Sequence, residues 1–288
     1  MGNVVSVKID SSMHGHRIEY VLKNLKISSS LMNRLKREKD GILLNGVQSP
    51  VIAKVSEGDT LVVNIKGRNA ENIVPVNLPL DILCEDEDIL VVIKPGTMPV
   101  HPSRNHKTDT LANAVMYYLG SKEAIHIITR LDRETSGVVL IAKNPRAAAI
   151  LTEDMKTGKI KKEYIAVLNG VPVNLKDTIC APIKKKDGKG ISRCVDKAGK
   201  EAVTQYEIMK KTDTLSLVKL FPITGRTHQL RVHMSYIGHP IYGDAMYGAT
   251  QSGERTRLHC HRIIFLHPIT REDIMVVAPI PKDFNGLV

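Results

Sequence analysis

The stretch RLDRETSGVVLIAKN, which covers residues 130–144, joins a charged irregular segment to an apolar run. The segment Val138–Lys143 has the length and aliphatic composition of a buried strand, and Gly137 directly precedes it. Ile125–Ile128, before the charged segment, is predicted to be a second strand. A loop between two strands holds its side chains on a rigid rim, where catalytic groups are often placed. Residues 129–137 are therefore the first candidate for a functional site.

Asp132 lies between Arg130 and Arg133 in this loop. Neighbouring guanidinium groups favour the ionised carboxylate, so Asp132 is suited to nucleophilic attack and unsuited to acting as a general acid. The alternative is an ordinary Arg–Asp pair on a surface loop. The loop sequence alone leaves both interpretations open.

Two further segments carry candidate chemistry. In residues 221–233 a Thr-Gly pair opens a predicted helix at 227–237, so Arg226 and free backbone N–H groups could bind an anion. The alternative there is a capped surface helix. Tyr164 lies near the start of a predicted strand at 161–168, where its ring could stack on a base or simply be half-buried.

The remainder of the chain after residue 80 alternates short apolar runs with amphipathic stretches and shows no internal repeat. Further strands are predicted near Ile82 and at 89–93, 202–209, 214–220 and 273–278. Helices are predicted at 110–119 and at 146–156, the second with Asn144-Pro145 at its start. This pattern predicts a single α+β domain.

The first 65 residues have the pattern of a compact module with two helices and a small sheet. Helices are predicted at 16–26 and 31–39, and Asn45-Gly46 is the strongest short signal for a β-hairpin. The second predicted helix carries four basic residues, Arg34, Lys36, Arg37 and Lys39. Such a cluster could grip phosphate, and the alternative is a solvated helix face.

A linker is expected between this head and the body. Residues 67–79 have no sustained period and contain two prolines. We therefore divide the chain into a head at 1–66, a linker at 67–79 and a body at 80–288.

The charge of the chain favours a polyanionic partner. It carries 41 Lys and Arg against 30 Asp and Glu, a formal net charge of +11, and basic surfaces of this kind favour nucleic acid. The longest apolar runs have about five residues, far short of the roughly 18 of a membrane span. The four cysteines stand far apart, which fits a reducing cytoplasm. We expect a cytoplasmic monomer that does not associate with membranes.

Two resemblances extend these predictions. Residues 12–66, with the pattern GILLNG…VSEGDTLVV, resemble the small S4-like RNA-binding domain first described in a small-subunit ribosomal protein. Residues 80–280 closely resemble the RluA-type family of RNA pseudouridine synthases. This second resemblance is carried by RLDRETSGVVLIAKN, KKEYIAVLNG and TGRTHQLRVHMSYIGHPIYGDAMYG, with LVVIKPGTMPVHPS and LHCHRIIFLHP as further landmarks.

The resemblance implies a fold and a reaction. The fold is a mixed, largely antiparallel sheet with flanking helices and a central cleft. The reaction is the isomerisation of uridine to pseudouridine within RNA, with no cofactor and no metal. Asp132 matches the family's catalytic aspartate, Tyr164 the tyrosine that stacks on the target base, and Arg226 the arginine that pairs with the aspartate.

The resemblance also implies residues that bind the substrate. Arg130 matches a residue that occupies the space vacated by the flipped base, and Leu258 resembles the apolar residue that packs beneath the uracil. Thr129 departs from the family, which commonly has His before the Arg-Leu-Asp. That departure does not affect the aspartate itself.

The sequence also bears on which RNA is the substrate and on two alternative functions. Because an S4-like domain is more typical of family members that act on ribosomal RNA, large-subunit ribosomal RNA is the expected substrate and transfer RNA the alternative. A non-catalytic RNA-binding or ribosome-assembly protein would explain the charge but not the three matched catalytic residues together. A metal-dependent hydrolase would need a zinc site assembled from residues whose spacing matches no standard zinc pattern, namely His259, Cys260 and His261 with His228 and His233.

Overall fold

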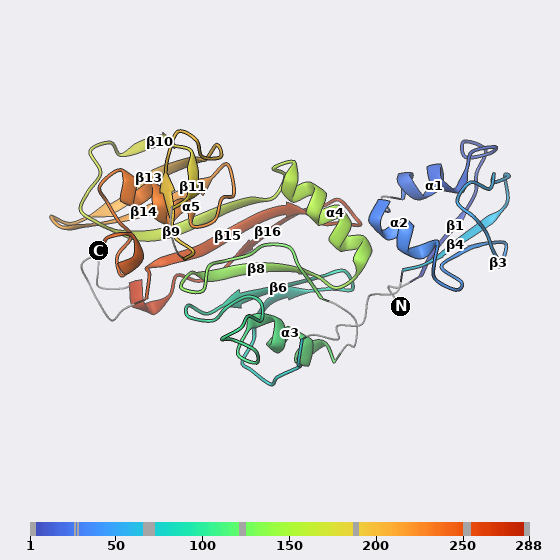
Figure 1. Cartoon of the computed structure of the whole chain (residues 1–288), viewed down its shortest axis with the longest axis horizontal. Helices are drawn as coiled ribbons and strands as arrows, with labels where there is room; N and C mark the ends of the chain where they lie inside the picture. The colour runs from blue at the N-terminus through green and yellow to red at the C-terminus, as the bar shows by residue number, and fades with distance from the viewer. Residues whose placement is uncertain are drawn as a thin grey trace.

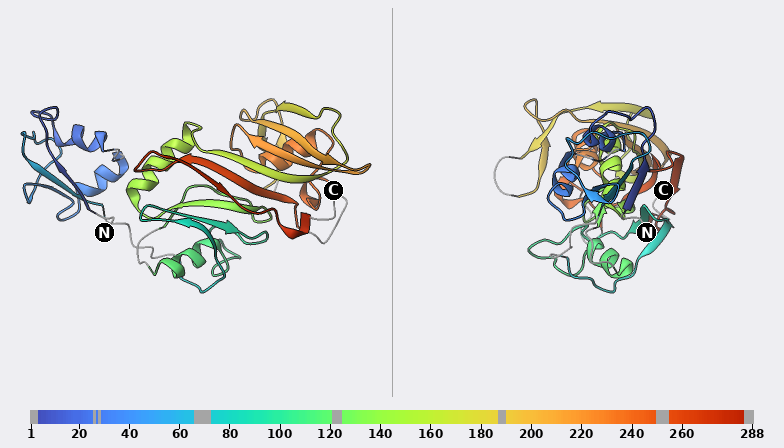
Figure 2. Two further views of the ribbon diagram at one scale, coloured as in Figure 1. Left: turned by 180° about the vertical axis from the view of Figure 1, so that it is seen from behind. Right: turned by 90° about the vertical axis from the view of Figure 1, so that its right-hand side faces the viewer.

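The computed structural model describes residues 4–25, 27, 29–65, 73–120, 125–186, 190–249 and 255–284. A small N-terminal head and a larger body follow one another along the long axis (Figures 1 and 2). Each part has its own hydrophobic core, the head from residues between Ile9 and Ile65 and the body from residues between Ile89 and Ala278. Among the described helices, none is both long and apolar enough to cross a membrane.

The head packs two helices on a four-stranded antiparallel sheet. The helices are α1 (Ile18–Asn24) and α2 (Ser29–Leu35). The strand order is β1 (Val4–Lys8), β4 (Thr60–Asn64), β2 (Ile42–Leu44) and β3 (Val47–Gln48). Asn45 and Gly46 join β2 to β3 with φ angles of 52° and 81°, as a tight hairpin turn requires, so the predicted hairpin is confirmed.

The second helix of the head ends four residues earlier than the predicted Lys39. After Leu35 the backbone tightens, because the Arg37 N–H donates to the carbonyl of Arg34 and the Glu38 N–H to that of Leu35. Gly41 then packs on the helix end, where an added Cβ would lie 2.3 Å from the Leu35 carbonyl oxygen.

The predicted linker lies partly outside the described residues, which resume at Ile73. Residues 73–79 have no regular structure, but they are fastened to the body. The Val76 N–H donates to the carbonyl of Asn113 at 3.1 Å, and Asn113 Nδ2 donates to the carbonyl of Val74 at 2.7 Å. This end of the linker is therefore packed along helix α3 (Leu111–Leu119).

Within the described residues, a ten-stranded sheet forms the body, and its pairings there are antiparallel except the one between β8 and β15. The main path runs in the order β10 (Lys176–Cys180), β13 (Val203–Lys211), β14 (Leu215–Pro222), β9 (Lys161–Asn169), β15 (Leu258–Leu266), β8 (Ser136–Ala142), β6 (Ile89–Lys94) and β5 (Asp81–Glu85). Off this path, β16 (Asp273–Val277) pairs with β15 and β7 (His126–Ile127) with β8. A small hairpin of β11 (Ile183–Lys185) and β12 (Arg193–Val195) stands apart. The mixed, largely antiparallel α+β fold is confirmed.

The strand β15 was not predicted, although it is central. It lies between β9 and β8, and its start pairs in parallel with the start of β8 through His259 opposite Ser136. The two backbones come so close that a Cβ on Gly137 would lie 2.2 Å from the Cys260 carbonyl oxygen, and Gly137 has a φ of 118°. Only glycine satisfies both conditions, which explains the glycine at the end of the Asp132 loop.

Helices flank the sheet of the body (Figure 1). Helix α3 begins at a capping box in which Thr110 and Asn113 bond each other's backbone, and α4 (Pro145–Lys156) begins with Asn144 as its N-cap. Both agree with the predicted helices. Helix α5 (Gln229–Tyr236) begins two residues later than predicted, because His228 has a left-handed backbone with a φ of 56°.

Candidate active site

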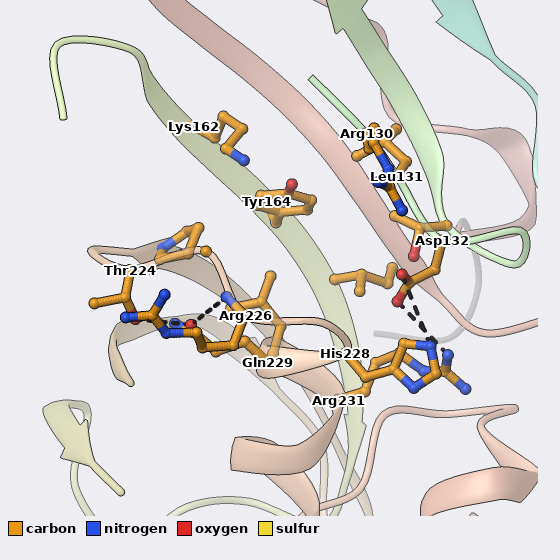
Figure 3. Close-up of a pocket in the computed structure, with 15 residues that line it drawn as sticks. Arg130, Leu131, Asp132, Lys162, Tyr164, Thr224, Arg226, His228, Gln229 and Arg231 are labelled. Atoms are coloured by element: carbon orange, nitrogen blue, oxygen red, sulfur yellow. Dashed lines mark hydrogen bonds and ion pairs between the residues drawn. The ribbon is translucent and has the colours of Figure 1, made fainter. Parts of the chain in front are cut away.

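All five residues assigned to catalysis and substrate binding line one pocket of about 120 Å³. They are Arg130, Asp132, Tyr164, Arg226 and Leu258. They come from the loop before β8, from β9, from the segment before α5 and from the start of β15 (Figure 3). The fold therefore gathers into one cavity residues that lie up to 128 positions apart in the chain.

Buried side chains hold the loop that carries Asp132 in place. Thr129 is almost fully buried, and its hydroxyl accepts the N–H of Leu140 at 2.8 Å. Lys94 is fully buried at the end of β6, and its Nζ donates to the Arg133 carbonyl at 3.0 Å, to that of Pro95 at 2.7 Å and to that of Met98 at 2.8 Å. Thr129 thus supports the loop and does not form the surface of the pocket.

The charge state of Lys94 depends on two opposed effects. Burial lowers its pKa to about 7, and the charge of Asp132 acts in the opposite direction. Three carbonyl oxygens accept hydrogen bonds from its amine, which matches the three hydrogens of the ammonium form. Sequence reasoning missed this residue, although a lysine at the end of a fully apolar strand was a usable signal.

The arginine beside Asp132 is Arg231, and the expected pairing with Arg226 is wrong. Arg231 Nη1 lies 3.6 Å from Asp132 Oδ2, whereas Arg226 Nε donates to the Glu201 carbonyl at 2.8 Å. The side chain of Gln229 decides this arrangement, because its Oε1 accepts the Arg226 N–H at 3.0 Å and keeps Arg226 outside the helix. Arg226 remains at the exposed rim of the pocket (Figure 3).

Arg231 is itself held by a buried carboxylate. Its Nε and Nη2 each donate to one oxygen of Asp244 at 2.7 Å, and Asp244 is only 1 % exposed. Burial acts to lower the pKa of Arg231, but the hydrogen bonds and charge of Asp244, together with the charge of Asp132, raise it above the usual value. Arg231 is therefore a fixed cation that spans two carboxylates.

The two arginines that flank Asp132 in the sequence, Arg130 and Arg133, do not place their guanidinium groups beside its carboxylate as expected. The Arg133 guanidinium bonds Glu134 at 2.8 Å and 3.1 Å, and Arg130 is exposed at the rim of the pocket. The positive charge around Asp132 comes instead from Lys94 and Arg231, which are distant in the sequence. The side chain of Asp132 stays 29 % exposed and so is reachable from the pocket.

Tyr164 and Leu258 form the apolar side of the pocket. Both are buried, and they lie on the neighbouring strands β9 and β15. Burial raises the pKa of Tyr164 well above its usual value, and the neighbouring Cys260 and Asp132 raise it further, so its hydroxyl is neutral. A flat ring and an aliphatic side chain beside a carboxylate suit a planar, uncharged ligand.

The histidines proposed as zinc ligands do not converge. His233 bonds Thr204 and the Ala181 carbonyl, His261 bonds the Ala278 carbonyl, and His259 bonds Ser136. Among the described residues, the donor atoms close enough to hold a metal belong to Asp86, Asp88 and His267, which do not line the pocket. The geometry therefore does not assemble the zinc site of a hydrolase.

In the head, the four predicted RNA-binding residues differ in exposure. Lys36, Arg37 and Lys39 are exposed on the turns that follow α2. The side chain of Arg34 is 17 % exposed and lies 3.3 Å from Glu38. The cluster therefore presents three cations to solvent, with Arg34 packed behind them.

Comparison with known proteins identifies a family that fits this site. Residues 88–236 match the family described as RNA pseudouridylate synthase. The uncharacterized RNA pseudouridine synthase YjbO of Bacillus subtilis (strain 168) is 38 % identical over 269 residues, which covers 92 % of this chain and 95 % of that protein.

Two further proteins are similar over most of the body or the chain. Ribosomal large subunit pseudouridine synthase D of Pasteurella multocida is 33 % identical over 305 residues and covers 99 % of this chain and 94 % of its own. Among solved structures, human RNA pseudouridylate synthase domain containing 1 superposes with a TM-score of 0.61 at 29 % identity. That match covers 70 % of this chain and 83 % of the human one.

Proposed function

Because this chain belongs to the RluA-type family of RNA pseudouridine synthases, we propose that it isomerises specific uridines of large-subunit ribosomal RNA to pseudouridine. The observation that supports this proposal most directly is the pocket itself. It brings Asp132 together with Tyr164 and Leu258, and Arg231 Nη1 lies 3.6 Å from Asp132 Oδ2. Relatives named for the large ribosomal subunit, which match over nearly the whole chain, support the choice of RNA.

The chemistry requires one bond to break and another to form at the same sugar carbon. The bond between uracil N1 and C1′ breaks, a bond between C5 and C1′ forms, and N1 gains a proton as C5 loses one. Asp132 starts the reaction either by attack on C1′ or by removal of a proton from the sugar to give a glycal. Arg231, whose Nη1 lies 3.6 Å from Asp132 Oδ2, orients the carboxylate in both routes.

The remaining pocket residues serve the displaced base. A uracil inside an RNA stack must leave it before Asp132 can reach the sugar, at a cost of a few kcal/mol. We assign stacking on the displaced uracil to Tyr164, the contact beneath it to Leu258, and filling of the vacated space to Arg130. Arg226, at the exposed rim, is assigned a contact to phosphate.

The decisive experiment is pseudouridine mapping on defined RNAs. Purified protein is incubated separately with transcribed large-subunit RNA, small-subunit RNA and total transfer RNA, and pseudouridine is located at nucleotide resolution. We expect near-stoichiometric pseudouridine at discrete positions of the large-subunit RNA alone. Modification confined to transfer RNA would overturn the substrate, and the absence of modification in every RNA would overturn the enzymatic function.

We also propose that the head binds RNA through Lys36, Arg37 and Lys39, as its resemblance to S4-like domains suggests. Their exposure and charge support this role, because cations at the surface can replace the counterions of phosphate. The test is a triple Lys36→Gln/Arg37→Gln/Lys39→Gln variant. The matched control removes equal charge at the far end of the body, through Lys176→Gln/Lys210→Gln/Lys211→Gln.

The head variant should bind large-subunit RNA more weakly, and its dependence on salt should become shallower. Each lost phosphate contact reduces the slope of log K against log salt by about 0.7 to 0.9, so the variant should lose roughly two units and the control less than one. The single-turnover rate at saturating RNA should stay within about twofold of the parent. Equal salt slopes for the two triple variants would contradict an RNA-binding head.

The proposed substrate also bears on location and assembly. Because ribosomal RNA is made and modified in the cytoplasm of bacteria such as the relatives' sources, we propose that this chain acts there. One chain supplies every residue assigned to the pocket, which supports action as a monomer.

A further inference from the structure

The residue before helix α5 combines a strained backbone with a side chain aimed at the catalytic carboxylate. His228 has a φ of 56° and a ψ of 18°, the left-handed region that residues other than glycine seldom adopt. Its ring is buried, and Nε2 lies 3.9 Å from Asp132 Oδ1 (Figure 3). Strain of this kind persists where the surroundings hold a residue in place, often at a functional site.

A chain of hydrogen bonds determines which ring nitrogen of His228 carries the proton. The Arg193 N–H donates to Tyr247 Oη at 3.0 Å, and Tyr247 Oη lies 2.8 Å from His228 Nδ1. Tyr247 Oη already accepts from Arg193, so donation of its own hydrogen to His228 Nδ1 uses the hydroxyl both as acceptor and as donor. The proton of the neutral imidazole is therefore on Nε2, the nitrogen that faces Asp132.

The surroundings of His228 favour this neutral form. Burial lowers the pKa of His228 below its usual value, Asp132 and Asp244 oppose the shift, and Arg231 and Arg193 add to it. A neutral imidazole with its proton on Nε2 directs an N–H toward Asp132, 3.9 Å away, without adding a second full charge. The donor is fixed in direction by the hydroxyl of Tyr247 on the other side of the ring.

Tyr247, in the short helix Ala245–Tyr247, contacts both groups that approach Asp132. Its ring meets His228 edge to face with centroids 5.7 Å apart, and the guanidinium of Arg231 lies 5.0 Å from its centroid. The two donors approach different oxygens of Asp132, with Arg231 nearer Oδ2 and His228 nearer Oδ1. Together they approach both oxygens of the carboxylate.

We infer that His228 is a positioning residue that donates its Nε2 hydrogen to the Asp132 carboxylate in the tautomer set by Tyr247. The inference rests on the proposed function, because it assigns His228 a part in the same reaction. The inference includes a shortening of the 3.9 Å separation to a hydrogen bond in the RNA complex, because catalytic hydrogen bonds are often long without substrate.

The test compares two substitutions of similar polarity that differ in reach. In His228→Gln the amide nitrogen takes the place of Nε2 and can still donate to Asp132. In His228→Asn the shorter amide reaches only the position of Nδ1, and asparagine tolerates the left-handed backbone. His239→Asn is the matched control, since His239 bonds the Asn169 carbonyl and does not line the pocket.

The readout is the single-turnover rate at saturating large-subunit RNA, together with RNA affinity and melting temperature. His228→Asn should lower the rate about tenfold to a hundredfold, the equivalent of one hydrogen bond to a charged group. His228→Gln should recover most of that loss, and His239→Asn should match the parent. RNA affinity and melting temperature should change little in all three.

A second variant keeps the test informative if changes at His228 disturb folding. Tyr247→Phe retains the ring but removes the hydroxyl, so the tautomer is no longer set, and the rate should fall by about threefold to tenfold. The double variant Tyr247→Phe/His228→Asn should be no slower than His228→Asn alone, because both act through one hydrogen bond.

Equal rates for His228→Asn and His228→Gln, or additive losses in the double variant, would overturn the inference. A failure of the proposed function looks different, because the parent protein itself would then form no pseudouridine in this RNA.

Discussion

Replacing Asp132 with Asn should abolish pseudouridine formation while the protein still folds and binds RNA. The substitution preserves the shape of the side chain but removes the anion that acts on the sugar. We expect the single-turnover rate to fall by at least about ten-thousandfold, as losses of a catalytic nucleophile commonly do. Affinity for large-subunit RNA should stay within a few-fold, since binding depends mainly on contacts to phosphate.

The structure gives a reason to expect that this variant folds. The Asp132 side chain is 29 % exposed. In the Asp132→Asn variant, Arg231 still has its two bonds to the buried Asp244. Asp109→Asn is a suitable control, because Asp109 is an exposed aspartate of the same body that does not line the pocket. Substantial turnover by the Asp132 variant would remove it from the centre of the reaction.

Replacing Arg231 with Lys should lower turnover by about a hundredfold to a thousandfold, the usual cost of removing one aligned donor from a catalytic charge. The guanidinium reaches Asp132 and Asp244 together, and a single ammonium cannot reproduce that geometry. We therefore expect lysine to stay with the buried Asp244 and to leave Asp132 without its fixed cation. RNA affinity should change little.

The matched control is Arg271→Lys, because Arg271 also bonds both oxygens of a buried aspartate, Asp154, but does not line the pocket. That variant should keep the parent rate. Arg231→Ala should in addition lower the free energy of unfolding by about 3 to 5 kcal/mol, since it leaves the charge of Asp244 buried and unpaired. A parent-like rate for Arg231→Lys, measured beside chemical denaturation, would contradict the role assigned to Arg231.

Local sequence signals predicted most of the individual elements. The apolar run after Gly137 is strand β8, Asn144-Pro145 begins α4, and Asn45-Gly46 is the hairpin turn. Each of these depends on interactions between residues a few positions apart, which composition and spacing record directly. The strand β15 escaped prediction because its sequence mixes histidine and arginine with aliphatic residues. Its charged Arg262 bonds Glu163 on β9, a partner that no local pattern reveals.

For the site as well, some residues were predicted from the sequence and others were placed only by the tertiary structure. The resemblance of its motifs to the RluA-type family predicted Asp132, Tyr164 and Leu258 as site residues, and all three line the pocket. Only the tertiary structure decided that Arg231 rather than Arg226 approaches Asp132. Both arginines lie within six residues of one another, and the choice depends on where α5 begins. The left-handed His228 precedes that start, Gln229 holds the Arg226 backbone outside the helix, and Asp244 holds the Arg231 side chain, while β8 and β15 pair beside the Asp132 loop. The contacts of Asp244 and of the two paired strands join residues far apart in the chain, so spacing within one segment could not determine them.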